Sequence, residues 1–385
     1  MALTESPPHT TEPDDAQVLF REARRRRRRR WLVSGIVLVV VAAVVVAVAV
    51  NSHGVSPGTS VARTRSPEPA APPSVGLPAG ATRTLRSAGP LAVNPTGSLF
   101  VVDETRHEIL VRLDDGTFRV VAGDGVSGFA GDGGPARRAE LSDVTDLTFG
   151  PNGDLYLVDN GLVRVIDRHG VIETIVSPGT AHGLVTSGAS PGSAAAASQI
   201  ISVAVNPDNV IYAATPSQIY RLTSPDQLQP VAAVGETIDA AGTGQATATI
   251  GGFGQIAVDS RGDVYASSDD IGWSVYRITP EGTATYLGAA RGSGGTTADV
   301  ELGPGDTGYA GDGGTVVRAS GDQLVPSHPF GAGRGRCCFY MKDFAFSPGG
   351  AIYADNLGES AFGRYQEILS YSNGETTVLW KHRLG

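Results

Sequence analysis

A pattern of 13 residues that recurs along the chain places the strongest constraint on its fold. The copies are LAVNPTGSLFVVD (91–103), LTFGPNGDLYLVD (147–159), VAVNPDNVIYAAT (203–215), IAVDSRGDVYASS (256–268) and FAFSPGGAIYADN (344–356). Each copy reads as a short apolar strand, a turn built on Pro-x-Gly or a related sequence, and a second strand with an aromatic residue. Proline fixes φ and glycine supplies a positive φ, so this combination favours a tight hairpin.

Two further strands are predicted after each copy. The third-strand segments are EILVRL, VRVID, QIYRL, SVYRI and EILSYS, and the fourth-strand segments are FRVVAG, IETIVS, QPVAAVG, TATYLGAA and TTVLW. A repeated unit of four antiparallel strands is typical of a β-propeller blade. The 51 Gly and 24 Pro suit many short strands joined by turns. Strands do not alternate with helices, so neither a Rossmann-like sheet nor a TIM barrel is expected.

The spacing of the copies leaves the number of blades open. They start 56, 56, 53 and 88 residues apart. The last interval could hold a degenerate blade or a long insertion, so the all-β propeller would have five or six blades. Five visible copies favour five blades plus an insertion. Residues 83–90 could supply an edge strand that closes the ring against the last blade.

The units resemble NHL repeats, whose blades share an x-Pro-x-Gly-x-hydrophobic-Tyr-Val-x-Asp core. The resemblance covers roughly residues 83–381 and is clearest in the first two copies, which end in Asp103 and Asp159. It implies a bacterial, membrane-anchored NHL-type propeller over residues 83–385. NHL propellers commonly have six blades. Some similar propellers are lactonases or lyases with a central metal held by Glu, Asn and Asp, and we match no residues of this sequence to those ligands.

The first 82 residues predict a membrane anchor and a tether. Residues 24–30 are seven consecutive arginines, and residues 31–50 carry no charge and are long enough to span a bilayer as a helix. The arginines keep residues 1–30, a polar disordered tail, in the cytoplasm, so the C-terminal domain would be extracytoplasmic. The sequence Ala47-Val48-Ala49 leaves a cleaved signal peptide open, although the apolar stretch is longer than usual for one. Residues 51–82, rich in Pro, Ala and Ser, are expected to form a linker.

A glycine-rich sequence, GFAGDGGPA (128–136), lies between the first two units, and a shorter GYAGDGG recurs at 308–314. It does not fit a phosphate loop, because no Lys-Ser or Lys-Thr follows the glycines and Asp132 would repel an anion. Asp124 and Asp132 could contribute oxygen ligands to Ca²⁺, but calcium needs six or more oxygens and the stretch offers only two carboxylates. Both sequences are therefore interpreted as connectors between blades, and the sequence requires no cofactor.

Few residues suggest catalysis. Asp103 and Asp159 end the second strands of their units, with Asp355 near the same place in the last copy. Because these carboxylates recur with the repeat, they are interpreted as acceptors for backbone N–H groups of the following turn. The seven histidines form no HxH or HxxxH pair, so the sequence offers no zinc site. Gly-x-Ser-x-Gly occurs at 54–58 and 188–192, but neither match lies between a predicted strand and a helix, so no nucleophile elbow is expected.

The most unusual sequence is PSHPFGAGRGRCCFYMK (326–342), in the long last interval. Its two adjacent cysteines, Cys337 and Cys338, could bond to each other or bridge two chains in an oxidising compartment. A disulfide that rigidifies the loop is favoured over a functional role. The segment is cationic within an acidic chain, and its candidate residues for a ligand or partner surface are His328, Arg334, Arg336 and Tyr340.

These features favour a membrane-anchored extracytoplasmic propeller that binds or senses a protein, a peptide or a cell-envelope glycan. The net charge of −9 argues against a nucleic-acid partner. The alternative is a metal-dependent propeller enzyme, lactonase- or lyase-like, with its site in the central channel. Carboxylates and histidines that converge at the channel mouth would favour the enzyme. The sequence shows no such cluster, so it favours binding.

Overall fold

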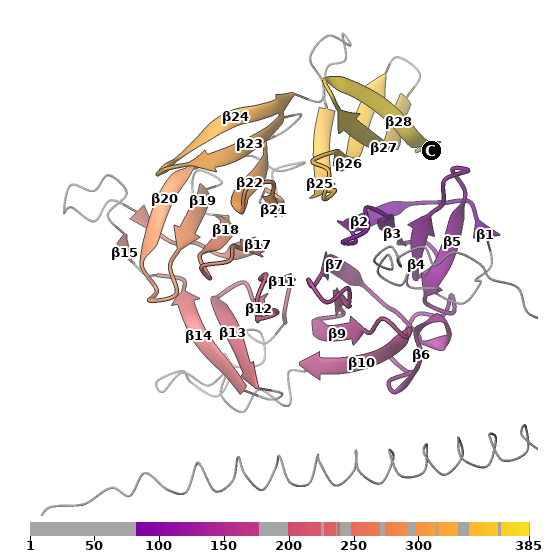
Figure 1. Ribbon diagram of the computed structural model, residues 1–385, viewed down its shortest axis with the longest axis horizontal. Helices are drawn as coiled ribbons and strands as arrows, with labels where there is room; N and C mark the ends of the chain where they lie inside the picture. Colours follow the sequence, from indigo (N-terminus) through magenta and orange to yellow (C-terminus); the bar gives the residue numbers. More distant parts are fainter. Residues whose placement is uncertain are drawn as a thin grey trace, which may run out of the picture. The chain divides into compact units, whose positions relative to one another are not determined.

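The chain folds into a ring of six antiparallel sheets, one for each blade of a β-propeller (Figure 1). The computed structural model describes residues 82–176, 199–224, 227–235, 237–238, 248–269, 274–290, 298–312, 315–329, 339–360 and 363–384. The chain divides into two units, 1–71 and 72–385, and every described residue belongs to the second. Within the described part, no helix is long and apolar enough to cross a membrane, and the predicted span at 31–50 lies outside it.

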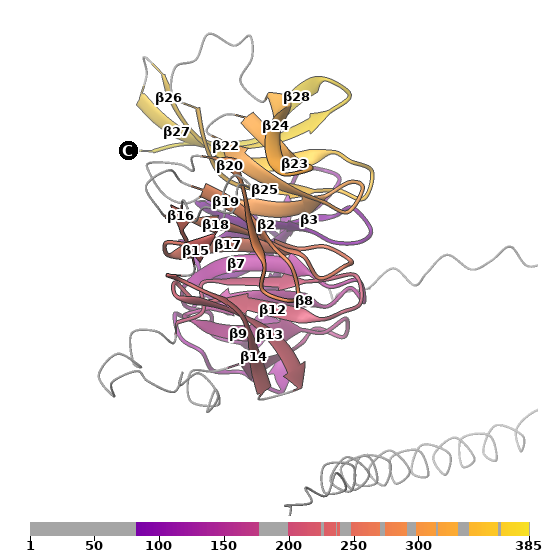
Figure 2. The same cartoon turned by 90° about the vertical axis from the view of Figure 1, so that its left-hand side faces the viewer.

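Four strands follow one another from the centre of the ring to its rim in each blade (Figures 1 and 2). Blade 1 contains β2 (Ala88–Val93), β3 (Leu99–Asp103), β4 (Glu108–Arg112) and β5 (Phe118–Ala122); blade 2 contains β7 (Val144–Phe149), β8 (Leu155–Asp159), β9 (Leu162–Ile166) and β10 (Val171–Val176). Blade 3 contains β11 (Ser202–Val205), β12 (Ile211–Ala214), β13 (Gln218–Ser224) and β14 (Gln227–Ala233); blade 4 contains β17 (Phe253–Val258), β18 (Val264–Ser268), β19 (Ser274–Ile278) and β20 (Ala284–Ala289). Blade 5 contains β21 (Val300–Gly303), β22 (Thr307–Asp312), β23 (Thr315–Ser320) and β24 (Gln323–Pro329); blade 6 contains β25 (Phe339–Phe346), β26 (Ile352–Ser360), β27 (Gly363–Ser372) and β28 (Glu375–Arg383).

Short elements lie between and beside the blades. They are β1 (Thr82–Arg83), β6 (Gly134–Pro135), the 3₁₀ helix η1 (Ala136–Arg138) and the two-stranded pair β15 (Thr237–Ile238) and β16 (Ala248–Thr249). Both β1 and β6 extend a blade outward, because β1 pairs with β5 and β6 pairs with β10.

The preference for five blades was wrong, because the long interval contains a sixth copy of the repeat. Residues 300–312, VELGPGDTGYAGD, form β21, a turn and β22, and they align residue for residue with LTFGPNGDLYLVD. This copy starts 44 residues after Ile256 and 44 residues before Phe344. The interpretation of GYAGDGG as a connector was therefore also wrong, since most of it is the second strand of blade 5.

The glycines of that strand fit against the aromatic rings of neighbouring residues. A Cβ at Gly308 would lie 2.3 Å from the ring of Tyr265 in blade 4, closer than any real contact. A Cβ at Gly311 would lie 3.5 Å from Met341, an ordinary contact distance. The ring of Tyr265 lies where Gly308 has no side chain and the other copies carry Leu, Ile or Val, so the strand looks degenerate in sequence and is regular in structure.

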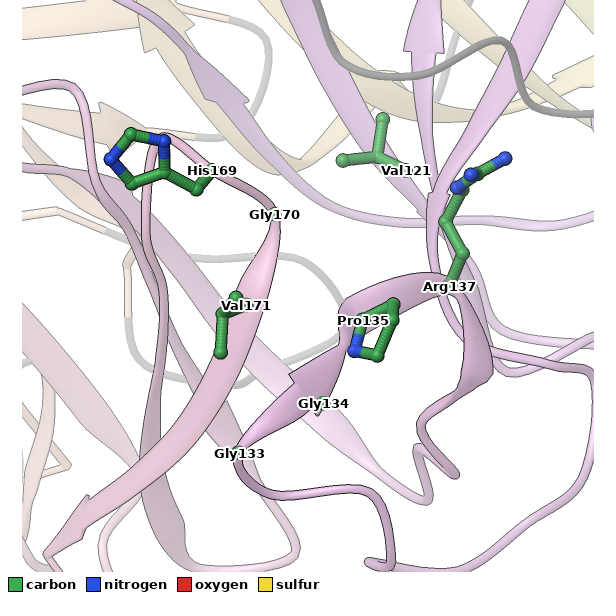
Figure 3. A pocket seen from close by; sticks show the side chains of 8 residues that line it. All are labelled: Val121, Gly133, Gly134, Pro135, Arg137, His169, Gly170 and Val171. Atoms are coloured by element: carbon green, nitrogen blue, oxygen red, sulfur yellow. The ribbon is translucent and has the colours of Figure 1, made fainter. Parts of the chain in front are cut away.

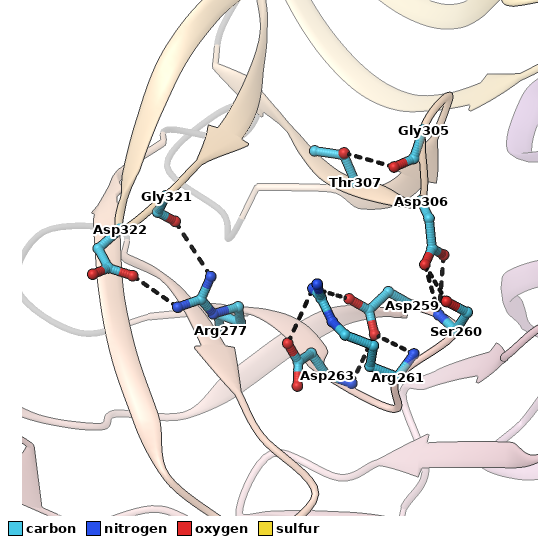
Figure 4. A network of polar contacts seen from close by, with 10 residues as sticks. All are labelled: Asp259, Ser260, Arg261, Asp263, Arg277, Gly305, Asp306, Thr307, Gly321 and Asp322. Atoms are coloured by element: carbon cyan, nitrogen blue, oxygen red, sulfur yellow. Dashed lines mark hydrogen bonds and ion pairs between the residues drawn. The ribbon is translucent and has the colours of Figure 1, made fainter.

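The predicted hairpin turn is present in each copy. Glycine takes a positive φ at its fourth position, for example 91° at Gly97, and Asn209 (63°) and Asp306 (57°) do so in the two copies without a glycine there. The first turn residue supports the loop with its side chain: Asp259 Oδ1 accepts hydrogen bonds from the backbone N of Arg261 and of Asp263, both at 2.9 Å (Figure 4). The corresponding turn of blade 5 contacts this turn of blade 4, because Asp306 accepts the backbone N–H of Ser260 at 3.0 Å.

The aromatic residue of each second strand joins its blade to the next one. Phe100 packs with Leu147 of blade 2, and Tyr309 packs with Phe344 of blade 6. The equivalent residues in the other four blades are Tyr156, Tyr212, Tyr265 and Tyr353. The core is therefore a series of six clusters between blade faces rather than one central core. The apolar surface buried in each cluster stabilises the fold by roughly 25 cal/mol per Å².

The ring closes through side chains and not through a shared strand, contrary to the prediction for residues 83–90. No strand of the first blade pairs with blade 6 in the described residues, because β1 pairs with β5. Instead Gln366 of β27 binds both the backbone N and the backbone O of Ala88, at 3.1 and 2.6 Å. Trp380 of β28 donates its indole N–H to Leu85 O at 3.2 Å. Apolar residues of both blades, including Leu91 and Ile368, share one cluster across this joint.

Candidate functional site

The six inner strands surround a central channel, and one repeat position lines the joints between them. This position, directly before each copy of the repeat, is occupied in blades 1 to 6 by Pro90, Asp146, Ser202, Gln255, Asp299 and Asp343. At four joints its side chain accepts the first backbone N–H of the following blade's repeat. We call these four contacts the inter-blade relay.

The relay distances are short. Asp146 Oδ2 accepts Val203 N at 2.7 Å and also the hydroxyl of Ser202 at 2.7 Å. Ser202 Oγ in turn accepts Ile256 N at 3.1 Å, so blades 2, 3 and 4 are linked in series. Each bond satisfies a polar group inside the molecule, where an unpaired one would cost about 1–3 kcal/mol.

The relay continues through blade 6. Asp299 Oδ2 accepts Phe344 N at 2.9 Å, which joins blade 5 to blade 6. Asp343 Oδ2 accepts Leu91 N at 2.7 Å, which joins blade 6 to blade 1. The carboxyl groups of Asp299 and Asp343 are hydrogen-bonded to each other.

Four carboxyl groups converge in the channel: Asp146, Asp299, Glu301 and Asp343. Burial raises the pKa of Asp146 to about 7, against the lowering effect of its bonds from Ser202 and Val203. Burial, followed by the charge of Asp343, raises the pKa of both Asp299 and Glu301 well above the usual range. Burial also raises the pKa of Asp343, although its bonds with Asp299 and Leu91 oppose the shift.

Part of the surface of these carboxyl groups remains reachable by water. Asp146 and Glu301 line a polar cavity of about 30 Å³ together with residues of β11 and β17. Space of this size can hold ordered water, so the groups touch solvent locally while protein surrounds them at longer range. Among the residues the structure describes, no three His, Cys, Asp or Glu side chains are arranged to hold a metal ion.

The histidines lie away from this channel cluster. His107 Nδ1 is 2.7 Å from Ser142 O in the loop between blades. His169 is exposed in the turn between β9 and β10, and His328 packs against Tyr309 and Tyr371. The carboxylates that would favour an enzyme do converge, whereas the described histidines do not join them.

The connector GFAGDGGPA folds over blade 2 and is held by a buried arginine. Arg164 of β9 is fully buried, and its guanidinium pairs with Asp159 Oδ2 and Asp132 Oδ1, both at 2.9 Å. It also donates to the carbonyl of Glu140 at 2.9 Å. Asp132 Oδ2 accepts Thr174 N at 3.1 Å, so both oxygens of this proposed calcium ligand have protein partners. Asp124 is used separately, as acceptor for Val126 N at 2.9 Å.

The strand-ending aspartates are acceptors, but mainly for the segment before the blade and not for the following turn. Asp103 accepts Arg86 N at 3.1 Å and Asp159 accepts Ser142 N at 2.8 Å. The two donors, Arg86 and Ser142, lie just before the first strand of the blade that contains the aspartate. Asp355 instead binds the side chain of Gln366, which carries the ring-closing bonds to Ala88.

The connector also forms a pocket of about 270 Å³ at the rim between blades 1 and 2 (Figure 3). Arg137 and His169 lie on opposite sides of the space, and its lining is completed by Val121, Gly133, Gly134, Pro135, Gly170 and Val171. The two most exposed large apolar side chains of the described residues are Phe129 (66%), in this connector, and Val126 (53%), just before it. Neither the pocket nor the channel cluster was identified from the sequence.

The predicted loop at 326–342 is only partly described. Arg334, Arg336, Cys337 and Cys338 lie outside the described residues, so the disulfide stays a prediction. The backbone of Tyr340 belongs to β25 and pairs with Leu357. His328 is not in a loop but in β24, half-buried between blades 5 and 6, and burial lowers its pKa.

Known proteins were compared with the chain. No curated protein gives a significant match. Among solved structures, the chain resembles virginiamycin B lyase from Staphylococcus aureus (13% identity, TM-score 0.45, 77% of this chain and 84% of the lyase). It also resembles a gluconolactonase from Xanthomonas campestris (13%, 0.44, 69% and 82%). A third is the extracellular domain of a one-component system from B. thetaiotaomicron (11%, 0.41, 76% and 33%).

The family described as Teneurin NHL domain matches residues 118–320, which is more than half of the chain. The six four-stranded blades agree with this match. The chain therefore belongs to the Teneurin NHL domain family and is an NHL-repeat β-propeller.

Proposed function

We propose that this protein is a membrane-tethered, extracytoplasmic binding propeller that recognises an acidic peptide segment of a partner protein. The tether is proposed from the sequence alone, from the arginine run at 24–30 and the uncharged stretch at 31–50. This topology places residues 83–385 outside the cell membrane, where a propeller presents its loops to other molecules.

The observation that carries the proposal is the rim pocket with its connector. Arg137 and His169 face the same space from two sides, in a part of the chain that is otherwise acidic. The whole chain carries −9 and its first 30 residues carry +3, which leaves −12 for the rest. A local cationic pocket beside exposed Phe129 and Val126 suits a ligand with carboxylates and apolar side chains.

The test is a binding measurement on the full chain in detergent micelles. The probes are a fluorescein-labelled peptide of alternating Glu and Leu and a matching Lys and Leu peptide, read by fluorescence anisotropy. We expect the acidic peptide to bind and the basic one not to bind. An exposed charge is worth about 0.2–1 kcal/mol, so a carboxylate placed in the pocket by His169→Asp should weaken binding of the acidic peptide by about 1.4- to 5-fold.

A matched control lies next to His169. Arg168 is also exposed but does not line the pocket, so Arg168→Gln should leave the affinity unchanged. Phe129→Ser, like the His169 variant, should weaken binding of the acidic peptide. Arg137 has a further interaction within the protein, so His169 is the cleaner substitution. Equal losses with His169→Asp and Arg168→Gln would reject the pocket as the site, as would binding of a polyanionic envelope glycan in place of the peptide.

The channel carboxyls are the observation in favour of the second candidate, a propeller enzyme. Four acids with raised pKa values could serve as proton donors at neutral pH. Three of them, however, accept backbone N–H groups in the relay, and this structural role is enough to explain why they are buried. Hydrolysis of a lactone by the full chain, abolished by Glu301→Gln, would support the enzyme and contradict the binding module.

A further inference from the structure

The joint between blade 6 and blade 1 is the point where the ring depends most on non-covalent contacts. The other neighbouring blades follow one another along the chain, whereas blade 6 meets blade 1 only after the whole ring has been traversed. At this joint β25 reaches β2 through Asp343, whose Oδ2 accepts Leu91 N at 2.7 Å. The preceding joint uses Asp299 in the same way, with Phe344 N as donor at 2.9 Å. Two consecutive joints therefore depend on carboxyl oxygens.

These two carboxyls also lie within hydrogen-bonding reach of each other, so that one proton can be shared between them. An ionised carboxylate can only accept hydrogen bonds, so a bond between two carboxyls requires that one of them is protonated. With both groups ionised, two negative charges in hydrogen-bond contact would repel. The arrangement of Asp299 and Asp343 is consequently compatible with one proton held by the pair.

The surroundings of the pair are mostly acidic. Glu301 of β21 faces Asp343, and Asp146 of β7 faces both of them across the channel. Asp355 of β26 adds a third acidic neighbour. The strands β2, β11 and β17, which complete the channel wall, have no titratable side chain.

One cation lies close by but is already engaged. Lys342 Nζ donates to Glu104 at 2.6 Å and to Ala88 O at 3.3 Å. From β22, Tyr309 points into the cluster between blades 5 and 6, and Asp312 is exposed. Among the described residues, nothing else near the pair carries a positive charge that could replace the proton.

We infer that Asp299 and Asp343 form a proton-binding site that closes the ring, so that proton uptake tightens the joints of blade 6 and proton release loosens them. The direction follows from linkage. Burial raises the pKa of both groups in the folded protein above the value in the unfolded chain. The stabilisation is therefore complete below the unfolded pKa and is lost as pH rises through the folded one. A protein on the outer face of a membrane would then hold its ring more tightly in acidic surroundings.

Hydrogen exchange of the full chain, read by mass spectrometry from pH 5 to pH 8 and corrected for the intrinsic rate, tests this inference. Each unit by which the pKa in the folded protein exceeds the pKa in the unfolded chain changes the equilibrium between the closed and the open joint tenfold. Protection of peptides covering β2 and β25 should fall by about tenfold or more over this range. The outer strands of blade 3, β13 and β14, are the internal control, because they contain no acidic side chain and no relay residue. Peptides covering β13 and β14 should keep their protection.

The decisive variants are Asp343→Asn and Asp299→Asn, which keep a side-chain oxygen acceptor but remove the titration. Each should stay folded and lose most of the pH dependence at β2 and β25. An unchanged pH dependence in both variants would overturn the inference. So would failure of both to fold at every pH, because a neutral pair is the state that the inference assigns to the closed ring. A parallel fall in protection at β13 and β14 would show a global effect and would equally reject it.

Discussion

Arg164 offers a direct measure of how the connector is held, and we expect Arg164→Leu to lower the free energy of unfolding by about 3–5 kcal/mol. The guanidinium pairs with Asp159 and Asp132 and donates to the carbonyl of Glu140. The side chain of Asp159 is fully buried, so its charge would lose its only cationic partner among the described residues. The side chain of Asp132 is 45% exposed and can be hydrated, so it adds little to the cost.

Two matched variants separate these contributions. Asp132→Asn should cost less than about 1 kcal/mol, because it removes only the exposed partner. Adding Asp159→Asn to Arg164→Leu removes the uncompensated charge and keeps an acceptor for Ser142 N, so stability should partly return. Arg164 Nε is itself buried without a partner among the described residues, which places the expected loss toward the lower end of the range.

Urea unfolding of the full chain, followed by tryptophan fluorescence, provides the free energies. Trypsin provides an independent readout, because Arg137 and Arg138 of η1 directly follow the connector and should be cleaved faster once Arg164 no longer holds it. A loss below about 1 kcal/mol with unchanged cleavage would refute the argument, since a buried carboxylate without its cation must cost more than an exposed one.

The remaining predictions concern the fifth blade and the membrane topology. Gly308→Ala should destabilise the propeller by about 1–3 kcal/mol in thermal unfolding, because its Cβ would meet the ring of Tyr265. Gly311→Ala, in the same strand, should be tolerated, and equal effects of both would contradict the packing described for blade 5. Protease added to intact cells should remove the chain beyond about residue 51, and protection of the propeller would show that the arginine run does not set the orientation.

The blade itself could be predicted from the sequence, because every strand and turn is encoded within one repeat. Apolar segments about ten residues apart and turns with a positive-φ glycine, such as Gly97, are local signals. The sixth blade was missed because Gly308 stands where the other copies carry Leu, Ile or Val. Its signal was nevertheless present in Pro304, in Tyr309 and in the division of 88 residues into two intervals of 44.

The candidate sites could not be predicted, because each residue comes from a different blade. Asp146 and Asp343 are 197 positions apart (343 − 146), and each is preceded and followed by an ordinary strand sequence. Only ring closure brings them to one channel, where lost hydration and mutual repulsion raise their pKa values. In the same way, Arg137 and His169 share a pocket only because the connector folds over blade 2.

The amino-acid sequence by itself determined the four-stranded unit, its turn and the aromatic residue that joins one blade to the next. Strand period and turn chemistry act over a few residues, so they are legible without the fold. The tertiary structure alone decided how many blades complete the ring, how the first and last blades meet and which carboxyls share the channel. These depend on distances between residues far apart in the chain, and only the packed ring sets those distances.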